Sequence, residues 1–196
     1  MLSFILGLTA FCLYFLYDIN SVTRQYRWVH TFFTVGTVLL GAATVLDLAA
    51  AWNAGAFSGA LDFLLLALAG VCFAALIYCL FFALPFQETY AGQHTGRQVY
   101  SGGVYGLCRH PGILCFFGME LFLGLAALPG EMMIRGLIFS LLNLGYAYFQ
   151  DRITFPKTFC DYSDYQKNVP FLIPTGSSIR RTGKPLHPAD KEEEKK

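Results

Sequence analysis

The residues whose types and spacing best suit ligand binding or catalysis lie in one short run, Ser101 to Pro111, immediately before an apolar stretch. Pro111 suits the first turn of a helix, because the N–H that proline lacks would have no partner there. Arg109 and His110 therefore flank a helix amino terminus, where free backbone N–H groups and the positive end of the helix dipole favour an anion. The Arg109 guanidinium adds a planar fork for a carboxylate or phosphate. This run predicts an anion-binding site.

A second polar pair, Gln150 and Asp151, follows the next apolar stretch along the chain. The two stretches are joined only by 129–131, so they are expected to form antiparallel neighbouring helices. Helices of about 17 and 19 residues rise roughly 25 and 28 Å, so their far ends return to the same depth. The sequence therefore predicts that Arg109 and His110 face Gln150 and Asp151 across one pocket, with donors on one wall and acceptors on the other.

Two further residues, Glu120 and Tyr162, are candidates for contacting a substrate. Glu120 lies ~13.5 Å beyond Pro111 along the expected helix, and an ionisable group near the middle of the bilayer is a functional candidate. The competing explanation, which we favour, is a hydrogen bond from Asn143 of the next helix to a neutral Glu120. Tyr162 and Tyr165 share one face of a short interfacial helix, which either closes the pocket or lies on the lipid surface.

The elements that must position these residues are apolar helices. Of the 196 residues, 55% are hydrophobic and 14% are charged, which is too much apolar surface for the interior of a soluble globule of this size. Five stretches are long enough, or nearly so, to cross a hydrocarbon core of roughly 30 Å, at about 2–17, 28–51, 59–84, 112–128 and 132–149. We expect an all-α integral membrane bundle of about five transmembrane helices in one domain, 1–174, followed by a disordered charged tail, 175–196.

The basic residues predict the orientation of the bundle. All but one of the 14 Lys and Arg residues lie on one side of the expected helices, and the exception is Arg135. The positive-inside rule assigns that side to the cytoplasm, so the amino terminus is expected outside and the carboxyl terminus and the pocket inside. Asp47, near the outer end of its helix, is expected to be hydrated.

Charge and cysteine placement exclude other classes of protein. The net charge is +1, so no strongly basic surface indicates a nucleic-acid partner. The six cysteines show neither CxxC spacing nor pairing with nearby histidines. We therefore expect neither a metal site nor a disulfide framework.

From Val99 to Pro174 the chain resembles the membrane-embedded methyltransferases typified by isoprenylcysteine carboxyl methyltransferase, and the related phospholipid methyltransferases. The pattern of that family is G-x-Y-x-x-x-R-H-P before a helix, an acidic pair at the end of the next helix, and a Y-x-x-Y-x-x-x-V-P-x-x-I-P ending. The residues that match it here are Gly103, Tyr105, Arg109, His110, Pro111, Gln150, Asp151, Tyr162, Tyr165, Val169, Pro170, Ile173 and Pro174.

The resemblance implies S-adenosylmethionine, bound in a cytoplasmic pocket at the ends of the last two helices, and methyl transfer to a lipid or lipidated acceptor. Arg109 and His110 are the implied catalytic residues. The cofactor-binding residues it implies are Gly103, Tyr105, Arg109, His110, Pro111, Gln150 and Asp151. The carboxylate of the cofactor suits Arg109 and His110, while Asp151 can accept from its ammonium or ribose hydroxyls. The acceptor is expected to be an amphipathic lipid or a prenylated small molecule or peptide.

Departures from the family pattern keep two other functions open. The family commonly has Tyr and Gly where this chain has Ile113 and Cys115, and two glutamates where it has Gln150 and Asp151. A nicotinamide-dependent lipid or sterol reductase has a similar carboxyl-terminal ending and is the alternative enzyme. A membrane scaffold that keeps the fold without turnover is the non-catalytic alternative.

Overall fold

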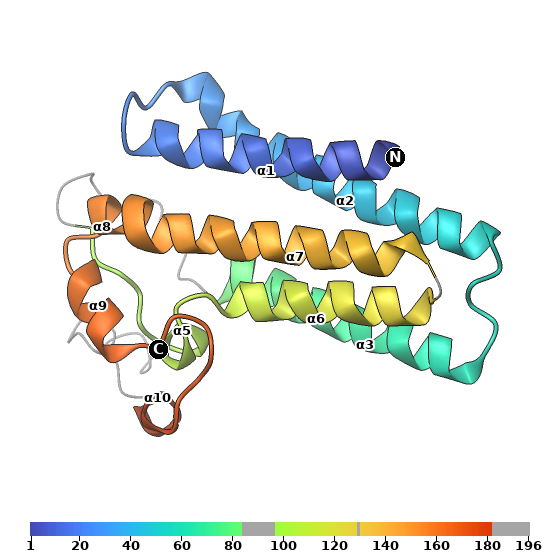
Figure 1. The fold of residues 1–196 in the computed structure, drawn as a ribbon. Coiled ribbons are helices and arrows are strands. Elements are labelled where there is room, and N and C mark those ends of the chain that lie inside the picture. Colours follow the sequence, from blue (N-terminus) through green and yellow to red (C-terminus); the bar gives the residue numbers. More distant parts are fainter. Residues whose placement is uncertain (84–96, 129, 182–196) are drawn as a thin grey trace. The chain divides into compact units, whose positions relative to one another are not determined.

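A computed structural model describes residues 1–83, 97–128 and 130–181 of the chain. Within these ranges all regular structure is helical, as predicted (Figure 1). The α-helices are α1 (Leu2–Ser21), α2 (Thr31–Asn53), α3 (Ala60–Ile77), α5 (Val104–Leu107), α6 (Pro111–Ala126), α7 (Glu131–Phe149), α8 (Phe155–Thr158), α9 (Tyr162–Asn168) and α10 (Gly176–Arg181). The 3-10 helix η1 (Arg27–His30) and the π-helical turns η2 (Tyr78–Phe82) and η3 (Gln150–Thr154) complete the order.

Four helical segments of the described chain are long and apolar enough to cross a membrane. They are Leu2–Ser21, Arg27–Asn53, Ala60–Phe82 and Glu131–Thr158. The remaining apolar helix, Pro111–Ala126, is shorter, because its 16 residues rise about 24 Å against a hydrocarbon core of roughly 30 Å. Four helices thus support a membrane protein, while a fifth crossing and the orientation of the bundle stay predictions.

The helix ends follow from local sequence. α6 begins at Pro111, as predicted, and α7 begins at Glu131, an acidic residue in the first turn, where the helix dipole favours a negative charge. Gly55, just beyond α2, has a φ of +71°, a conformation that favours glycine. α7 runs on through η3 into α8, so helical structure extends to Thr158, beyond the predicted end at Phe149.

The chain divides into two compact units. The first unit is Met1–Phe73 with Phe116–Thr154, and the second unit is Ala74–Cys115 with Phe155–Lys196. The first unit contains most of the long apolar helices. The second contains the run that ends in Arg109-His110-Pro111 (the RHP run) and the segment after η3. The predicted domain of 1–174 therefore has an internal division.

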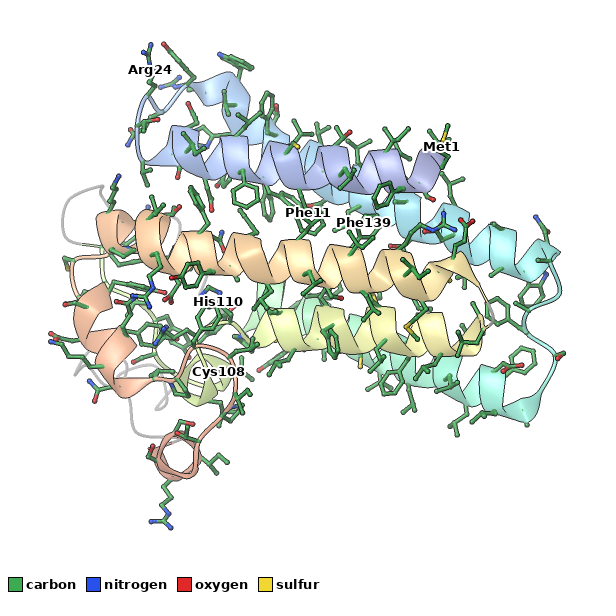
Figure 2. All side chains as sticks on the ribbon, in the orientation of Figure 1. Met1, Phe11, Arg24, Cys108, His110 and Phe139 are labelled. Carbon is green, nitrogen blue, oxygen red and sulfur yellow. The ribbon has the colours of Figure 1, made fainter. Side chains whose placement is uncertain are left out.

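Aromatic side chains join α1 to α7 in the first unit. Phe11 and Phe139 meet between the two helices with ring centroids 6.3 Å apart (Figure 2), and Tyr14 stacks on Tyr146 at 5.5 Å. Gly7 leaves open the space that the Phe139 ring occupies. In a membrane, helix association depends on such close packing, because lipid is as apolar as the helices themselves.

An ion pair and a hydrogen bond of Arg135 connect three helices of the same unit. Arg135 of α7 lies 2.6 Å from the Asp47 carboxylate of α2, and its Nη1 also donates to the Ser3 hydroxyl of α1 at 2.6 Å. Asp47 is only 7% exposed, so the expectation that it is hydrated is wrong. A guanidinium can make both contacts at once because its donors point in several directions within one plane.

The beginning of the polar tail is ordered in the second unit. α10 packs near α5, and Ser178 is buried. The Ser178 hydroxyl donates to the carbonyl of Thr175 and accepts from the N–H of Thr175. The expectation of a disordered tail is therefore wrong for Gly176–Arg181, and its remainder, 182–196, lies outside the described residues.

Replacing Gly7 with Ala tests the packing of α1 on α7. The added methyl group would overlap the Phe139 ring, so we expect the variant to lose about 1–3 kcal/mol of stability and to melt at a lower temperature in detergent. The matched control is Gly41→Ala on α2, where the added Cβ meets nothing within 4 Å and alanine favours the helix by roughly 0.5–1 kcal/mol. Equal melting temperatures for the two variants would contradict the contact.

Candidate functional site

A glycine and a proline shape the RHP run. Gly103 has a φ of +53°, which favours glycine, and leads directly into α5. The chain is extended at Cys108, just after α5, and Pro111 begins α6. Arg109 and His110 therefore lie on the short connection between α5 and α6, as two adjacent residues whose backbone N–H groups need partners.

The segment after α9 supplies those partners. The N–H of Arg109 donates to the carbonyl of Pro170 at 2.9 Å, and the N–H of His110 donates to the carbonyl of Phe171 at 3.2 Å. Both N–H groups are committed to carbonyls of the same chain. These two N–H groups therefore do not contribute to an anion site in this structure, and anion binding at the amino terminus of α6 stays a prediction.

The Arg109 side chain also bonds to the carboxyl end of α9. Its Nη1 donates to the carbonyls of Gln166 at 3.0 Å and Val169 at 2.6 Å, and its Cζ lies 5.7 Å from the centre of the Phe171 ring. Carbonyls at the end of a helix carry the negative end of its dipole and lack helical partners, so a guanidinium is favoured there. Arg109 thus clamps the end of α9, and its binding of a ligand carboxylate stays a prediction.

His110 is buried among aromatic rings. Its imidazole stacks on Phe155, with centroids 5.9 Å apart and planes 11° apart, and meets Phe171 at 5.0 Å and 60°. Figure 2 shows His110 and Cys108 on the connection that leads into α6. The rings fix the orientation of the imidazole, which both a ligand contact and a proton transfer require.

Tyrosines connect α5 to α9 and to η2. The Tyr165 hydroxyl donates to the carbonyl of Tyr105 at 2.6 Å, and the Tyr105 hydroxyl donates to the carbonyl of Cys79 at 2.9 Å. Tyr162 and Tyr165 are both buried in one cluster with Val169. The alternative in which this tyrosine face lies on lipid is therefore wrong. Tyr162 belongs to the core of the second unit, and a substrate contact by it stays a prediction.

The candidate pair Gln150 and Asp151 lies where α7 ends, in the first unit. α7 passes into η3, and π-helical turns of this kind frequently occur at functional sites. Asp151 and Thr154 are buried in this turn, and Gln150 is half-buried. Gln150 is a polar neighbour of Asp18, near the end of α1. The sequence prediction missed Asp18, which directly follows the apolar stretch 2–17, because α1 continues to Ser21. An ionisable residue within a longer apolar helix is the same signal that selected Glu120.

Glu120 lies inside the first unit, against α7. It is 5% exposed, and its Oε1 has no hydrogen-bond partner in the described chain. A Cβ atom at Gly136 would come within 2.9 Å of its Oε2. No hydrogen bond from Asn143 reaches Glu120 in the described ranges, so our favoured explanation for Glu120 is wrong. Its contact with Gly136 confirms that α6 and α7 are neighbours.

The candidate residues thus fall into two groups. The second unit brings together Gly103, Tyr105, Arg109, His110, Pro111 and Tyr162, and the first unit contains Gln150, Asp151 and Glu120. Each group is described within its own unit. The approach of Arg109 and His110 to Gln150 and Asp151 stays a prediction of the sequence.

Replacing Arg109 with Ala should loosen the second unit even without a ligand. The carbonyls of Gln166 and Val169 would lose a charged donor, and a hydrogen bond to a charged group contributes about 1.5–3 kcal/mol. We expect faster hydrogen exchange at the amides of Val169 and Phe171, measured by mass spectrometry in detergent. Arg24→Ala, at an exposed arginine, is the control and should leave these amides unchanged. Unchanged exchange in Arg109→Ala would show that Arg109 is not a clamp.

Labelling with a maleimide tests the environment of Cys108. Burial raises the pKa of the Cys108 thiol, so at any given pH less of it is reactive thiolate than in an exposed thiol. The exposed Cys160 should react at neutral pH, and Cys108 only after unfolding. Raising the pH toward about 8.5 should leave the labelling of Cys108 slow. Equal rates at the two peptides in a mass spectrum would contradict the burial of Cys108.

Similarity to known proteins assigns no family to the chain. Comparisons with protein-family models, with curated proteins and with solved structures give no match. Any function must therefore be argued from the motifs and contacts of this chain itself.

Proposed function

We propose that this chain is an integral membrane methyltransferase that uses S-adenosylmethionine to methylate a lipid or an isoprenylcysteine-like lipidated acceptor at the membrane interface. The proposal starts from the resemblance of residues 99–174 to the isoprenylcysteine carboxyl and phospholipid methyltransferases. It includes a bundle of about five transmembrane helices with a cytoplasmic cofactor pocket. The amino terminus would lie outside and the carboxyl terminus inside.

The observation that carries the proposal is the closure of the RHP run by the carboxyl-terminal motif. Arg109 Nη1 reaches the carbonyl of Val169 across a separation of 60 residues, and Tyr165 reaches Tyr105 across the same separation. Two halves that matched the family pattern by chance would have no reason to meet residue by residue in one compact unit. Their meeting supports treating them as one motif.

When bound, S-adenosylmethionine supplies an electrophilic methyl group on a positively charged sulfur. The work of the chain is to hold the donor, to align the acceptor behind the methyl group and to exclude water. Gln150 and Asp151 offer acceptor atoms at a buried helix end, which suits ammonium and hydroxyl groups. His110, held between Phe155 and Phe171, offers an oriented imidazole to a ligand carboxylate.

The exposed apolar surfaces of α2 and α3 favour an amphipathic acceptor. Both helices expose large apolar side chains, among them Val38 and Val45 on α2 and Leu64 and Val71 on α3. Such surfaces are stable against lipid and costly against water. An acceptor that reaches the enzyme from within the bilayer must carry an apolar chain together with the group to be methylated. A lipid or a prenylated molecule meets this condition.

Thermal stabilisation by ligands tests the proposal. The full chain in detergent should melt at a higher temperature with S-adenosylmethionine or S-adenosylhomocysteine, because a ligand at about 100 times its Kd adds about 2.7 kcal/mol. His110→Phe keeps a ring against Phe155 and loses both nitrogens, and Asp151→Asn keeps the shape and loses the charge. Each should reduce or abolish the shift. Glu131→Gln, at an exposed position, is the control and should retain it.

NADPH distinguishes the alternative enzyme in the same assay. A shift with NADPH and none with the two methionine-derived ligands would favour the nicotinamide-dependent reductase. No shift with any of the three would favour a non-catalytic scaffold. Transfer of a labelled methyl group to extracted membrane lipids by the unchanged chain, and its loss in Asp151→Asn, would then measure turnover.

A further inference from the structure

Asp18 is a carboxylate buried near the carboxyl end of α1. Only 3% of the residue is exposed. The turn that follows is held by Asn20, whose side chain both donates to the carbonyl of Tyr26 and accepts from its N–H. The end of α1 is therefore well anchored, and Asp18 is kept away from water by its surroundings.

The charge of Asp18 has no counterpart among the described residues. Its Oδ2 has no hydrogen-bond partner, and none of the ion pairs within the described ranges includes it. By contrast, Asp47, the other buried aspartate of the long α-helices, lies 2.6 Å from Arg135. Burying an unpaired carboxylate costs several kcal/mol. A cation from outside the chain would remove that cost.

The neighbours of Asp18 suit a cationic group of a ligand. Tyr146 of α7 and Gln150 of η3 are polar neighbours of the carboxylate, and the Tyr146 hydroxyl has no hydrogen-bond partner in the described chain. Tyr14 and Phe15 of α1 pack on the Tyr146 ring, with centroids 5.5 and 5.3 Å apart. Aromatic rings attract ammonium-type cations to their faces, and a carboxylate beside them adds a full opposite charge.

We propose that Asp18 binds the positive charge of S-adenosylmethionine, with Gln150 beside it as a further acceptor. This inference rests on the proposed function. It adds to the donor site a residue of α1, which lies outside the region 99–174 that carries the family resemblance. The charge is either the sulfonium or the α-ammonium group, since each can pair with a carboxylate.

Asp18→Asn in the full chain separates a binding role from a structural one. Asparagine keeps the shape and removes the charge, so the affinity for S-adenosylmethionine should fall at least about tenfold in a titration in detergent. The melting temperature without ligand should stay the same or rise, because an unpaired buried charge is removed. Asp47→Asn is the matched control. It removes the buried carboxylate that pairs with Arg135, so the ligand-free melting temperature should fall.

Three ligands identify the group that Asp18 contacts. S-adenosylmethionine carries both charges, S-adenosylhomocysteine lacks the sulfonium charge, and 5′-methylthioadenosine lacks both. A loss of affinity confined to the first assigns Asp18 to the sulfonium, and a loss for the first two assigns it to the ammonium. An equal loss for all three, no loss for any, or a fall in ligand-free melting temperature like that of Asp47→Asn would overturn the inference alone. Failure of the unchanged chain to bind S-adenosylmethionine would overturn the proposed function as well.

Discussion

The backbone pairing of Arg109 and His110 with Pro170 and Phe171 is the interaction on which the second unit depends. α5 and α9 are only 4 and 7 residues long, too short to be stable as isolated helices in water. They are ordered because longer-range contacts satisfy their ends, namely the two backbone bonds, the Arg109 guanidinium and the tyrosine hydroxyls. Arg109, the arginine of the RHP run, therefore stabilises the fold of the second unit. The same set of interactions orients His110.

The first unit is governed by a different constraint, because apolar helices in lipid gain little from burying apolar surface against one another. Shape and polar contacts must decide which faces meet. The fit of the Phe139 ring against Gly7 and the contact of Arg135 with Asp47 and Ser3 supply both. A single guanidinium satisfies a carboxylate and a hydroxyl from two other helices, which specifies their rotation about their own axes.

Buried carboxylates of the long helices differ in whether the chain itself neutralises them. Asp47 is paired, and its role is accounted for by the structure. Asp18 and Glu120 each retain an oxygen without a hydrogen-bond partner in the described chain. Asp18 also lies near Gln150 at the end of α7. A residue of α1 is therefore close to the Gln150-Asp151 pair that matches the family pattern. Pairing with Arg135 thus distinguishes Asp47, which stabilises the fold, from Asp18, which we propose to bind a ligand.

The sequence by itself determined the features that depend on neighbouring residues: the apolar helices, the start of α6 at Pro111 and the adjacency of α6 and α7. Only the tertiary structure decided that the Arg109 and His110 N–H groups are occupied, that Tyr162 is buried, that Asp47 pairs with Arg135, and that Glu120 has no bond from Asn143. These outcomes depend on contacts as distant as Ser3 with Arg135, 132 residues apart. Helices that are apolar on all sides carry no amphipathic pattern to indicate which face meets a neighbour, so their rotation, and every pairing that depends on it, is set only when the helices pack.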